Sequence, residues 1–148
     1  MEMSERSLLD ISINNYNSAF VLYQNLWGDE AELNIVGFHL QQCLEICVKY
    51  LLELEGIRYP KTHDIEVLER LALDNSVDLH FSEYLHEHTE MFSAWEAKSR
   101  YIIDYVLEKE KVQKALKELE TYLKEISVYV ESQYGIKPKN QIREEEKP

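Results

Sequence analysis

Glycine and proline are scarce in this chain, with four glycines and three prolines among 148 residues. Such a sequence has few positions that favour tight turns, and too few glycines for a loop that wraps around phosphate groups. It also lacks the alternation of apolar and polar residues that predicts a β-strand, and it has no internal repeat. These shortages favour long helices joined by short connections.

Basic side chains are also few, with 16 Lys and Arg against 28 Asp and Glu, for a net charge of -12. Phosphate binding draws most of its free energy from Lys and Arg, so this composition argues against an autonomous nucleic-acid binder. Residues 62–96 hold nine acidic residues and the single base Arg70. We interpret this stretch as a solvated surface, and the alternative is a face for a basic partner.

Cysteine is limited to Cys43 and Cys47, four residues apart within an apolar segment. This spacing predicts two buried thiols on one helix face, without a disulfide framework, and indicates a reducing cytoplasm. No apolar run approaches the ~20 residues needed to span a bilayer, and the acidic N-terminus lacks a signal segment. We therefore expect a cytoplasmic protein that does not enter a membrane.

Apolar residues instead recur at steps of three and four, the spacing of helix faces that pack into a core. The clearest face belongs to the segment before Gly56 and comprises Val36, Leu40, Cys43, Leu44, Cys47, Leu51 and Leu54. Because this helix is apolar over most of its circumference, we expect it to lie at the centre of a bundle. One line of its surface is polar and contains His39, Gln42 and Lys49.

The same spacing predicts an all-α, up-and-down bundle of about five helices. One domain spans residues 1–136, and the charged segment 137–148 is predicted to be disordered. The helices are expected from Ser4 or Ser7 to about Trp27, from 31–34 to Gly56, from Ile65 to 74–76, from about Phe81 to Tyr105, and from Val112 to Gly135. Thr62 or Asp64 is the expected N-cap of the third.

Two blocks of sequence resemble the HEPN domain family. The first is FHLQQCLEICVKYLL at residues 38–52 followed by GIRYPKTHDIEVL at residues 56–68, and the second is WEAKSRY at residues 95–101. The resemblance covers roughly residues 5–134. It implies a small helical domain, commonly a homodimer, that occurs in prokaryotes beside minimal nucleotidyltransferases in toxin–antitoxin systems.

Many HEPN proteins are ribonucleases, and the resemblance implies metal-independent RNA cleavage where an Arg-x4-6-His motif lies late in the chain. Here Tyr101 follows Arg100, and no histidine occurs after His88. Arg58 and His63 match Arg-x4-His, but they lie in the turn after the central helix. We therefore predict no catalytic residues, and keep an RNA endonuclease using this pair as the less favoured alternative.

Metal binding is not predicted either. His39, Cys43 and Cys47 recur every four residues, but the two thiols point into the core and no fourth zinc ligand lies nearby in the sequence. Glu83 and His86 form a single Glu-x-x-His, whereas a di-iron bundle needs a pair of them with further glutamates. We expect no metal and no obligatory cofactor.

The remaining candidate site is a polar groove on the central helix, the following turn and the Ser-Arg-Tyr segment. Its residues are His39, Gln42, Lys49, Lys61, His63, Arg100 and Tyr101. The favoured interpretation is a non-catalytic homodimeric interaction module, partner of a nucleotidyltransferase in a toxin–antitoxin or stress-response system. The alternative is that the groove binds a nucleotide such as ATP or GTP, because Lys, His and Arg beside tyrosine rings suit phosphate and base.

Overall fold

The computed structural model describes residues 7–26, 31–101 and 107–144, with the backbone alone for Ala31 and residues 99–101. These residues form six helices and no strand: α1 (Leu8–Gln24), α2 (Ala31–Leu54), α3 (Ile65–Asp74), α4 (Glu83–Glu87), α5 (Thr89–Tyr101) and α6 (Lys109–Tyr134). The prediction of an all-α bundle is therefore confirmed.

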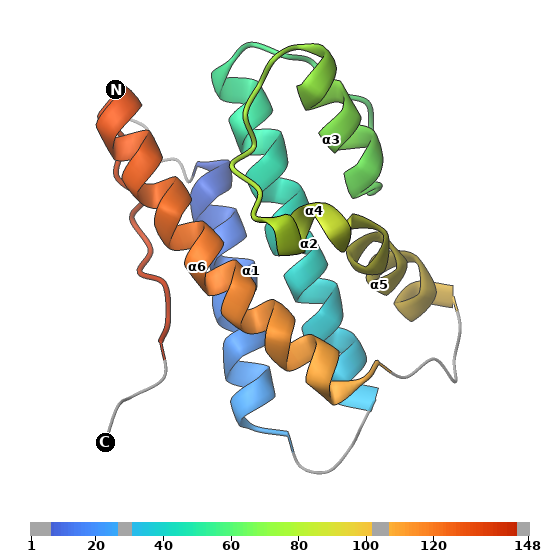
Figure 1. Cartoon of the computed structure of the whole chain (residues 1–148). Coiled ribbons are helices and arrows are strands. Elements are labelled where there is room, and N and C mark those ends of the chain that lie inside the picture. Colours follow the sequence, from blue (N-terminus) through green and yellow to red (C-terminus); the bar gives the residue numbers. More distant parts are fainter. Residues whose placement is uncertain (1–6, 27–30, 102–106, 145–148) are drawn as a thin grey trace.

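α2 lies at the centre of the bundle (Figure 1). It contacts α1, α3, α5 and α6, and α6 also packs against α1. α1 runs opposite to α2 and α6, while α3 and α5 lie on the side of α2 away from α1 (Figure 1). The most apolar helix of the sequence is thus surrounded by the others, as its nearly continuous apolar surface predicts.

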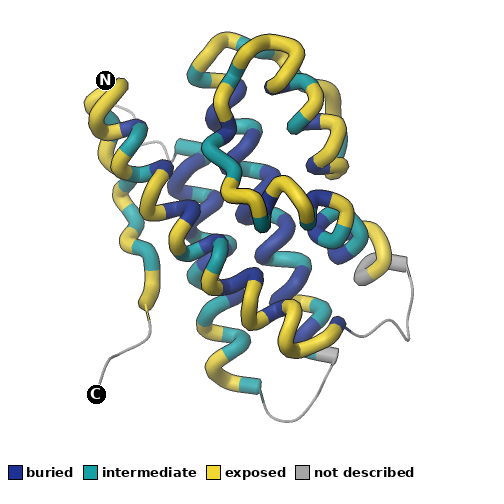
Figure 2. Tube along the Cα trace, viewed as in Figure 1, coloured by how far each residue is buried: buried dark blue, intermediate teal, exposed yellow. Residues whose placement is uncertain are grey.

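The core follows the helical faces that the sequence indicates, and Figure 2 shows the buried positions lining the inner sides of the helices. On α6 the predicted stripe is buried along its whole length: Val112, Leu116, Leu119, Leu123, Ile126 and Val130. From α5, the rings of Phe92 and Trp95 meet edge to face at 5.3 Å. None of the described helices has the length and apolar character needed to span a membrane.

The helix ends also follow local sequence signals. The Ser7 hydroxyl accepts a hydrogen bond from the Asp10 amide at 3.1 Å and so caps α1. At α3 the cap is Asp64, whose carboxylate accepts from the amides of Glu66 and Val67. Gly56 and Gly135 follow α2 and α6 with φ of +71° and +67°, a conformation that glycine adopts without steric cost.

One predicted helix differs from the structure, because the expected helix from Phe81 to Tyr105 is divided into α4 and α5. The break is at His88, whose ring Nδ1 lies 2.7 Å from the Tyr84 carbonyl oxygen. The His88 amide donates to Leu85 O instead, so the regular bonding of α4 ends there and α5 begins at Thr89. The expected end at Tyr105 lies outside the described residues.

The C-terminal segment, expected to be disordered from residue 137, lies along α1 as far as Glu144. The buried Asp10 carboxylate accepts hydrogen bonds from the amides of Lys139 (2.7 Å) and Asn140 (2.9 Å). Further along α1, the Asn17 side chain donates to the Gln141 carbonyl oxygen and accepts from the Arg143 amide. Polar side chains of α1 therefore bind extended backbone, which the charged composition of this segment does not indicate.

Candidate functional site

Glu45 is the centre of the polar cluster on α2. Its side chain is buried, and a buried carboxylate is stable only when it is paired and hydrogen bonded. Lys49 Nζ lies 2.8 Å from one carboxylate oxygen, and the other accepts from Gln41 Nε2 at 2.9 Å. His63 Nδ1 lies 3.0 Å from that same oxygen. Three side chains thus share the negative charge of Glu45.

Gln41 links the cluster to the backbone of the turn between α2 and α3. This fully buried amide donates to the His63 carbonyl oxygen at 3.0 Å as well as to Glu45. Its own oxygen accepts from Gln42 Nε2 at 2.7 Å. Asp64 caps α3 directly after His63, so the turn is held by Gln41 of α2 and by the start of α3. The His63 imidazole is thereby directed at α2.

Lys49 is further enclosed by the turn. Its ammonium group lies 5.4 Å from the centre of the Tyr59 ring, a distance suited to a cation–π contact. The Tyr59 hydroxyl donates to Glu53 at 2.5 Å. Burial, with the Glu53 carboxylate, raises the pKa of Tyr59 to about 12, so the hydroxyl stays protonated as a donor.

His39 belongs to a different contact. Its Nδ1 lies 2.9 Å from the Asn15 side-chain oxygen on α1, and burial lowers the pKa of the imidazole. The ring also meets Phe38 edge-on at 5.8 Å. His39 therefore joins α2 to α1 and lies more than one helical turn before Glu45.

The structure brings together three of the predicted groove residues: Gln42, Lys49 and His63. Lys61 and Arg58 are exposed in the turn, and the side chains of Arg100 and Tyr101 lie outside the described residues. Of the less favoured catalytic pair, Arg58 is exposed and His63 is held with its Nδ1 against Glu45 Oε1.

Gln41 and Glu45 were not among the predicted site residues, although they are buried at its centre. A signal was present in their spacing. Gln41, Glu45 and Lys49 recur every four residues, so they form a polar row on a helix that is otherwise mostly apolar. The sequence does not show that the row faces the turn at His63 and not solvent.

The cluster is poorly suited to an anion. Lys49 and His63 are the basic side chains that it gathers, and both already bond Glu45. A phosphate group placed beside them would meet the Glu45 and Glu53 carboxylates, which repel it.

The residues with the spacing of zinc ligands, His39, Cys43 and Cys47, do not form a metal site either. Cys43 and Cys47 are buried free thiols, and burial raises the pKa of both, that of Cys43 to about 12. The Cys43 sulfur lies 3.5 Å from the Ser12 hydroxyl, whereas His39 bonds Asn15. Within the described parts of the chain, no three His, Cys, Asp or Glu side chains are grouped to hold a metal ion.

The chain is thus a small helical-bundle domain, in which the polar row of a long central helix holds the capped turn before α3. The model of the HEPN domain family matches residues 6–132, which is most of the chain. The chain belongs to the HEPN domain family. No curated protein and no solved structure gives a significant match.

Proposed function

We propose that this HEPN protein is a non-catalytic interaction module. It forms a homodimer in a prokaryotic cytoplasm and acts beside a nucleotidyltransferase in a system of toxin–antitoxin or stress-response type. The observation that supports it most is that both basic side chains of the cluster, Lys49 and His63, are already bonded to Glu45. The sequence adds the missing late Arg-x4-6-His motif, since no histidine follows His88.

The outer row of α2 supports the homodimer. Ile35 is 49% exposed, and Phe38, Gln42 and Ile46 are half-buried at the three- and four-residue steps that follow it. A row of partly exposed and mostly apolar side chains on a central helix is typical of a surface that a second protein covers. The free, buried Cys43 and Cys47 suit the reducing compartment that the proposal assumes.

Light scattering during gel filtration tests the homodimer. We expect twice the mass of one chain, and we expect Ile35→Asp to raise the dimer dissociation constant by about tenfold or more, because it places a charge in the interface. Val21→Asp is the matched control, since Val21 is an exposed apolar residue of α1. A wild-type protein that remains monomeric at all concentrations contradicts the proposal.

Co-expression tests the partner. A nucleotidyltransferase encoded by the neighbouring gene is expected to copurify with the full chain in a fixed ratio through gel filtration. A nucleotidyltransferase that elutes separately, or the absence of any such gene beside this one, counts against this part of the proposal.

The nucleotide-binding alternative predicts heat on titration with ATP or GTP, lost in His63→Ala and in Arg100→Ala. The position of Glu45 and Glu53 argues against it, because each phosphate charge would approach a carboxylate. We therefore expect no heat up to millimolar nucleotide. Saturable binding that His63→Ala removes would favour this alternative over the interaction module.

A further inference from the structure

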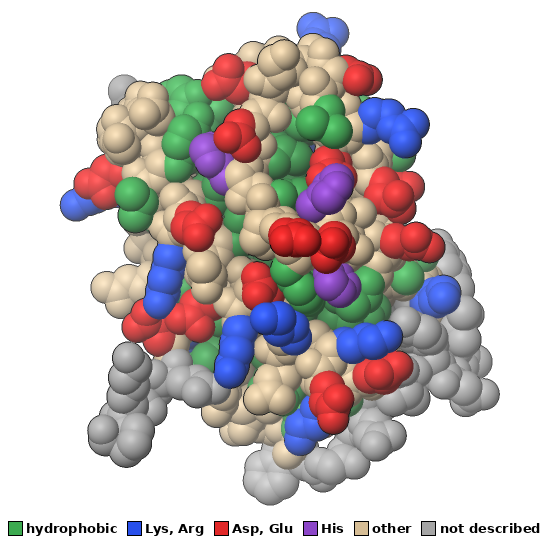
Figure 3. Space-filling view, in the orientation of Figure 1, with side chains coloured by type: hydrophobic (Ala, Val, Ile, Leu, Met, Phe, Trp, Pro, Cys, Tyr) green, Lys and Arg blue, Asp and Glu red, His purple; other side chains and the backbone are tan. Residues whose placement is uncertain are grey.

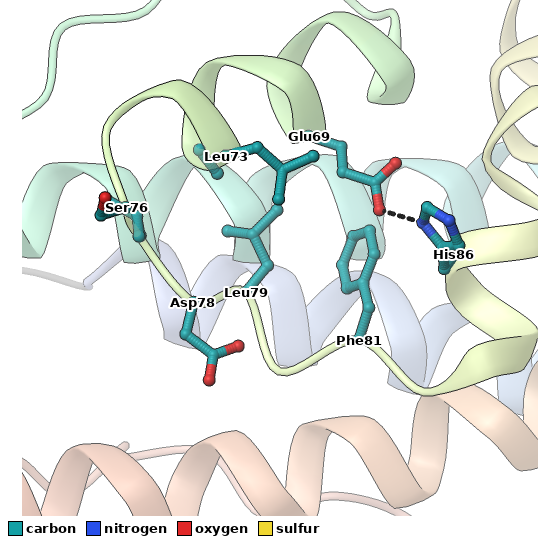
Figure 4. Close-up of a pocket in the computed structure, with 9 residues that line it drawn as sticks. Glu69, Leu73, Ser76, Asp78, Leu79, Phe81 and His86 are labelled. Atoms are coloured by element: carbon teal, nitrogen blue, oxygen red, sulfur yellow. Dashed lines mark hydrogen bonds and ion pairs between the residues drawn. The ribbon is translucent and has the colours of Figure 1, made fainter.

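A groove lies between α3 and the segment that leads to α4. It is lined by the C-terminal half of α3, away from the Asp64 cap. Its volume is about 440 Å³, and α4 closes one end through His86. Figure 4 shows Leu73, Leu79 and Phe81 directed toward one another across it. Leu79 is buried and forms part of the floor, whereas Leu73 on the α3 wall is 70% exposed. The groove therefore presents an apolar surface that this chain leaves uncovered.

The wall opposite α3 is held in place by contacts with α6 and within its own loop. The Tyr122 hydroxyl of α6 donates to the Leu79 carbonyl oxygen at 2.7 Å, and its ring meets Phe81 edge-on at 5.7 Å. In the same segment, Ser76 and His80 hold positive φ values of 56° and 59°, and the His80 amide donates to the Asp78 carboxylate at 2.7 Å. A groove held in this way is formed before anything binds, which lowers the entropic cost of binding.

Carboxylates lie at the rim. Glu69 on α3 pairs with His86 at 2.6 Å, and the Asp78 side chain on the other rim is 79% exposed. On the face shown in Figure 3, acidic side chains and histidines surround apolar surface. Residues 62–96 supply nine acidic residues and only Arg70 as a base. We call this apolar channel with Glu69 and Asp78 at its edges the acid-rimmed groove.

A second hollow continues the surface. It has a volume of about 190 Å³, is lined by Leu51, Leu54 and Tyr129, and shares Ser76, Val77 and Asp78 with the acid-rimmed groove. Glu55 adds a carboxylate there. Two hollows on either side of one short loop match an elongated chain segment better than a compact small molecule.

We propose that the acid-rimmed groove is the docking surface for a segment of a partner protein in which apolar residues are flanked by Lys or Arg. The inference rests on the proposed role as an interaction module and names the surface through which the partner would bind. An apolar side chain of the segment fills the channel beside Leu73 and removes its exposed surface from water. Its basic residues bond Glu69 and Asp78, and the net charge of -12 attracts them over longer distances.

The test selects segments from a random peptide library displayed on phage, using the full chain as bait. Selected peptides are expected to combine an apolar residue with neighbouring Lys or Arg, and to bind in a fluorescence anisotropy assay. Leu73→Ser and Asp78→Asn are expected to weaken this binding by at least about threefold to tenfold, because they remove the apolar wall and one rim charge. Asparagine keeps an oxygen for the His80 amide, so the loop is preserved.

Matched controls lie on α6. Val128 is 69% exposed, so Val128→Ser removes a similar apolar surface, and Glu125→Gln removes one charge from an exposed position. Neither should change the affinity. Enrichment of no peptide, of peptides without basic residues, or equal losses in variants and controls overturns the inference.

A dimer that Leu73→Ser converts to monomer also overturns it, because the groove would then join two copies of this chain. The two proposals fail separately. A monomeric protein that still binds basic peptides contradicts the proposed function, whereas a stable dimer with no peptide binding contradicts only the docking surface.

Discussion

Glu45 shows how one residue can hold an inter-helix turn in place. Its buried carboxylate bonds Gln41, Lys49 and His63, which come from two consecutive turns of α2 and from the turn before α3. Removing the carboxylate leaves the buried Gln41 amide and the mostly buried Lys49 ammonium group without this partner. The carboxylate thereby fixes the positions of the Lys49 and His63 side chains.

We expect Glu45→Ala to lower the free energy of unfolding by about 2–4 kcal/mol, because a buried ion pair is broken and its donors are left unsatisfied. Urea denaturation measures the change. Glu125→Ala, at an exposed position of α6, is the control and is expected to change it by less than about 0.5 kcal/mol. Similar losses in the two variants would show that the cluster adds no special stability.

Two histidines should titrate on opposite sides of the ordinary value of 6.5. The hydrogen bond and charge of Glu69 raise the pKa of His86, and burial lowers the pKa of His39. NMR titration of the ring protons measures both in one sample. Glu69→Gln should bring the pKa of His86 back toward 6.5 and leave that of His39 unchanged.

The consequences for stability have opposite signs. The contribution of His86 is complete below pH 6.5 and is lost as the pH rises through its folded pKa. For His39 the unfolded chain binds the proton more tightly, so stability falls as the pH decreases from 6.5 through the folded pKa. A His39 that titrates above 6.5 would contradict this assignment.

At the scale of elements, α2 is central because other parts of the chain approach it closely. Gly37 lies at one such approach: a Cβ atom at this position would lie 2.1 Å from the Leu107 Cδ2 atom and 3.4 Å from the Trp95 ring. The side chain of Leu107 is itself buried and has little space to move away.

Gly37→Ala should therefore destabilise the protein by about 1–2 kcal/mol, although alanine favours the helix by about 1 kcal/mol. Thermal denaturation measures the shift. In a double-mutant cycle with Leu107→Ala, the alanine at position 37 should cost less because the clashing methyl group is gone. Additive effects would show that a clash with the Leu107 side chain does not cause the destabilisation.

For the molecule as a whole, the C-terminal segment is part of the folded domain as far as Glu144. It pairs with Asp10, Asn14 and Asn17 of α1, residues more than a hundred positions earlier in the chain. Ile142 packs against the core beside them. The segment thus covers one side of α1.

Truncation after Ile136 should lower the free energy of unfolding by about 1–3 kcal/mol, since the buried Asp10 carboxylate loses two amide donors. Urea denaturation measures the loss. Asp10→Ala should cost less in the truncated chain than in the full chain. An equal cost in both would mean that Asp10 acts only at the start of α1, where it bonds Ser7.

The sequence by itself determined most of the helices, the candidates for their caps and the buried stripes, because these depend on residues within about four positions of one another. Gly135 was identifiable for this reason, whereas Ser7 and Asp64 were each one of two candidates, beside Ser4 and Thr62. The two sequence blocks likewise led to the HEPN family, which the match over residues 6–132 confirms.

Only the tertiary structure decided which polar side chains meet. Glu45 lies within reach of His63, Asp10 of Asn140, and α3 of the loop at Phe81, through packing between separate segments. Periodicity places a residue on a helix face but does not say what lies opposite that face. The cluster around Glu45, the C-terminal segment bound along α1 and the acid-rimmed groove all follow from such long-range contacts, which no local pattern of the sequence encodes.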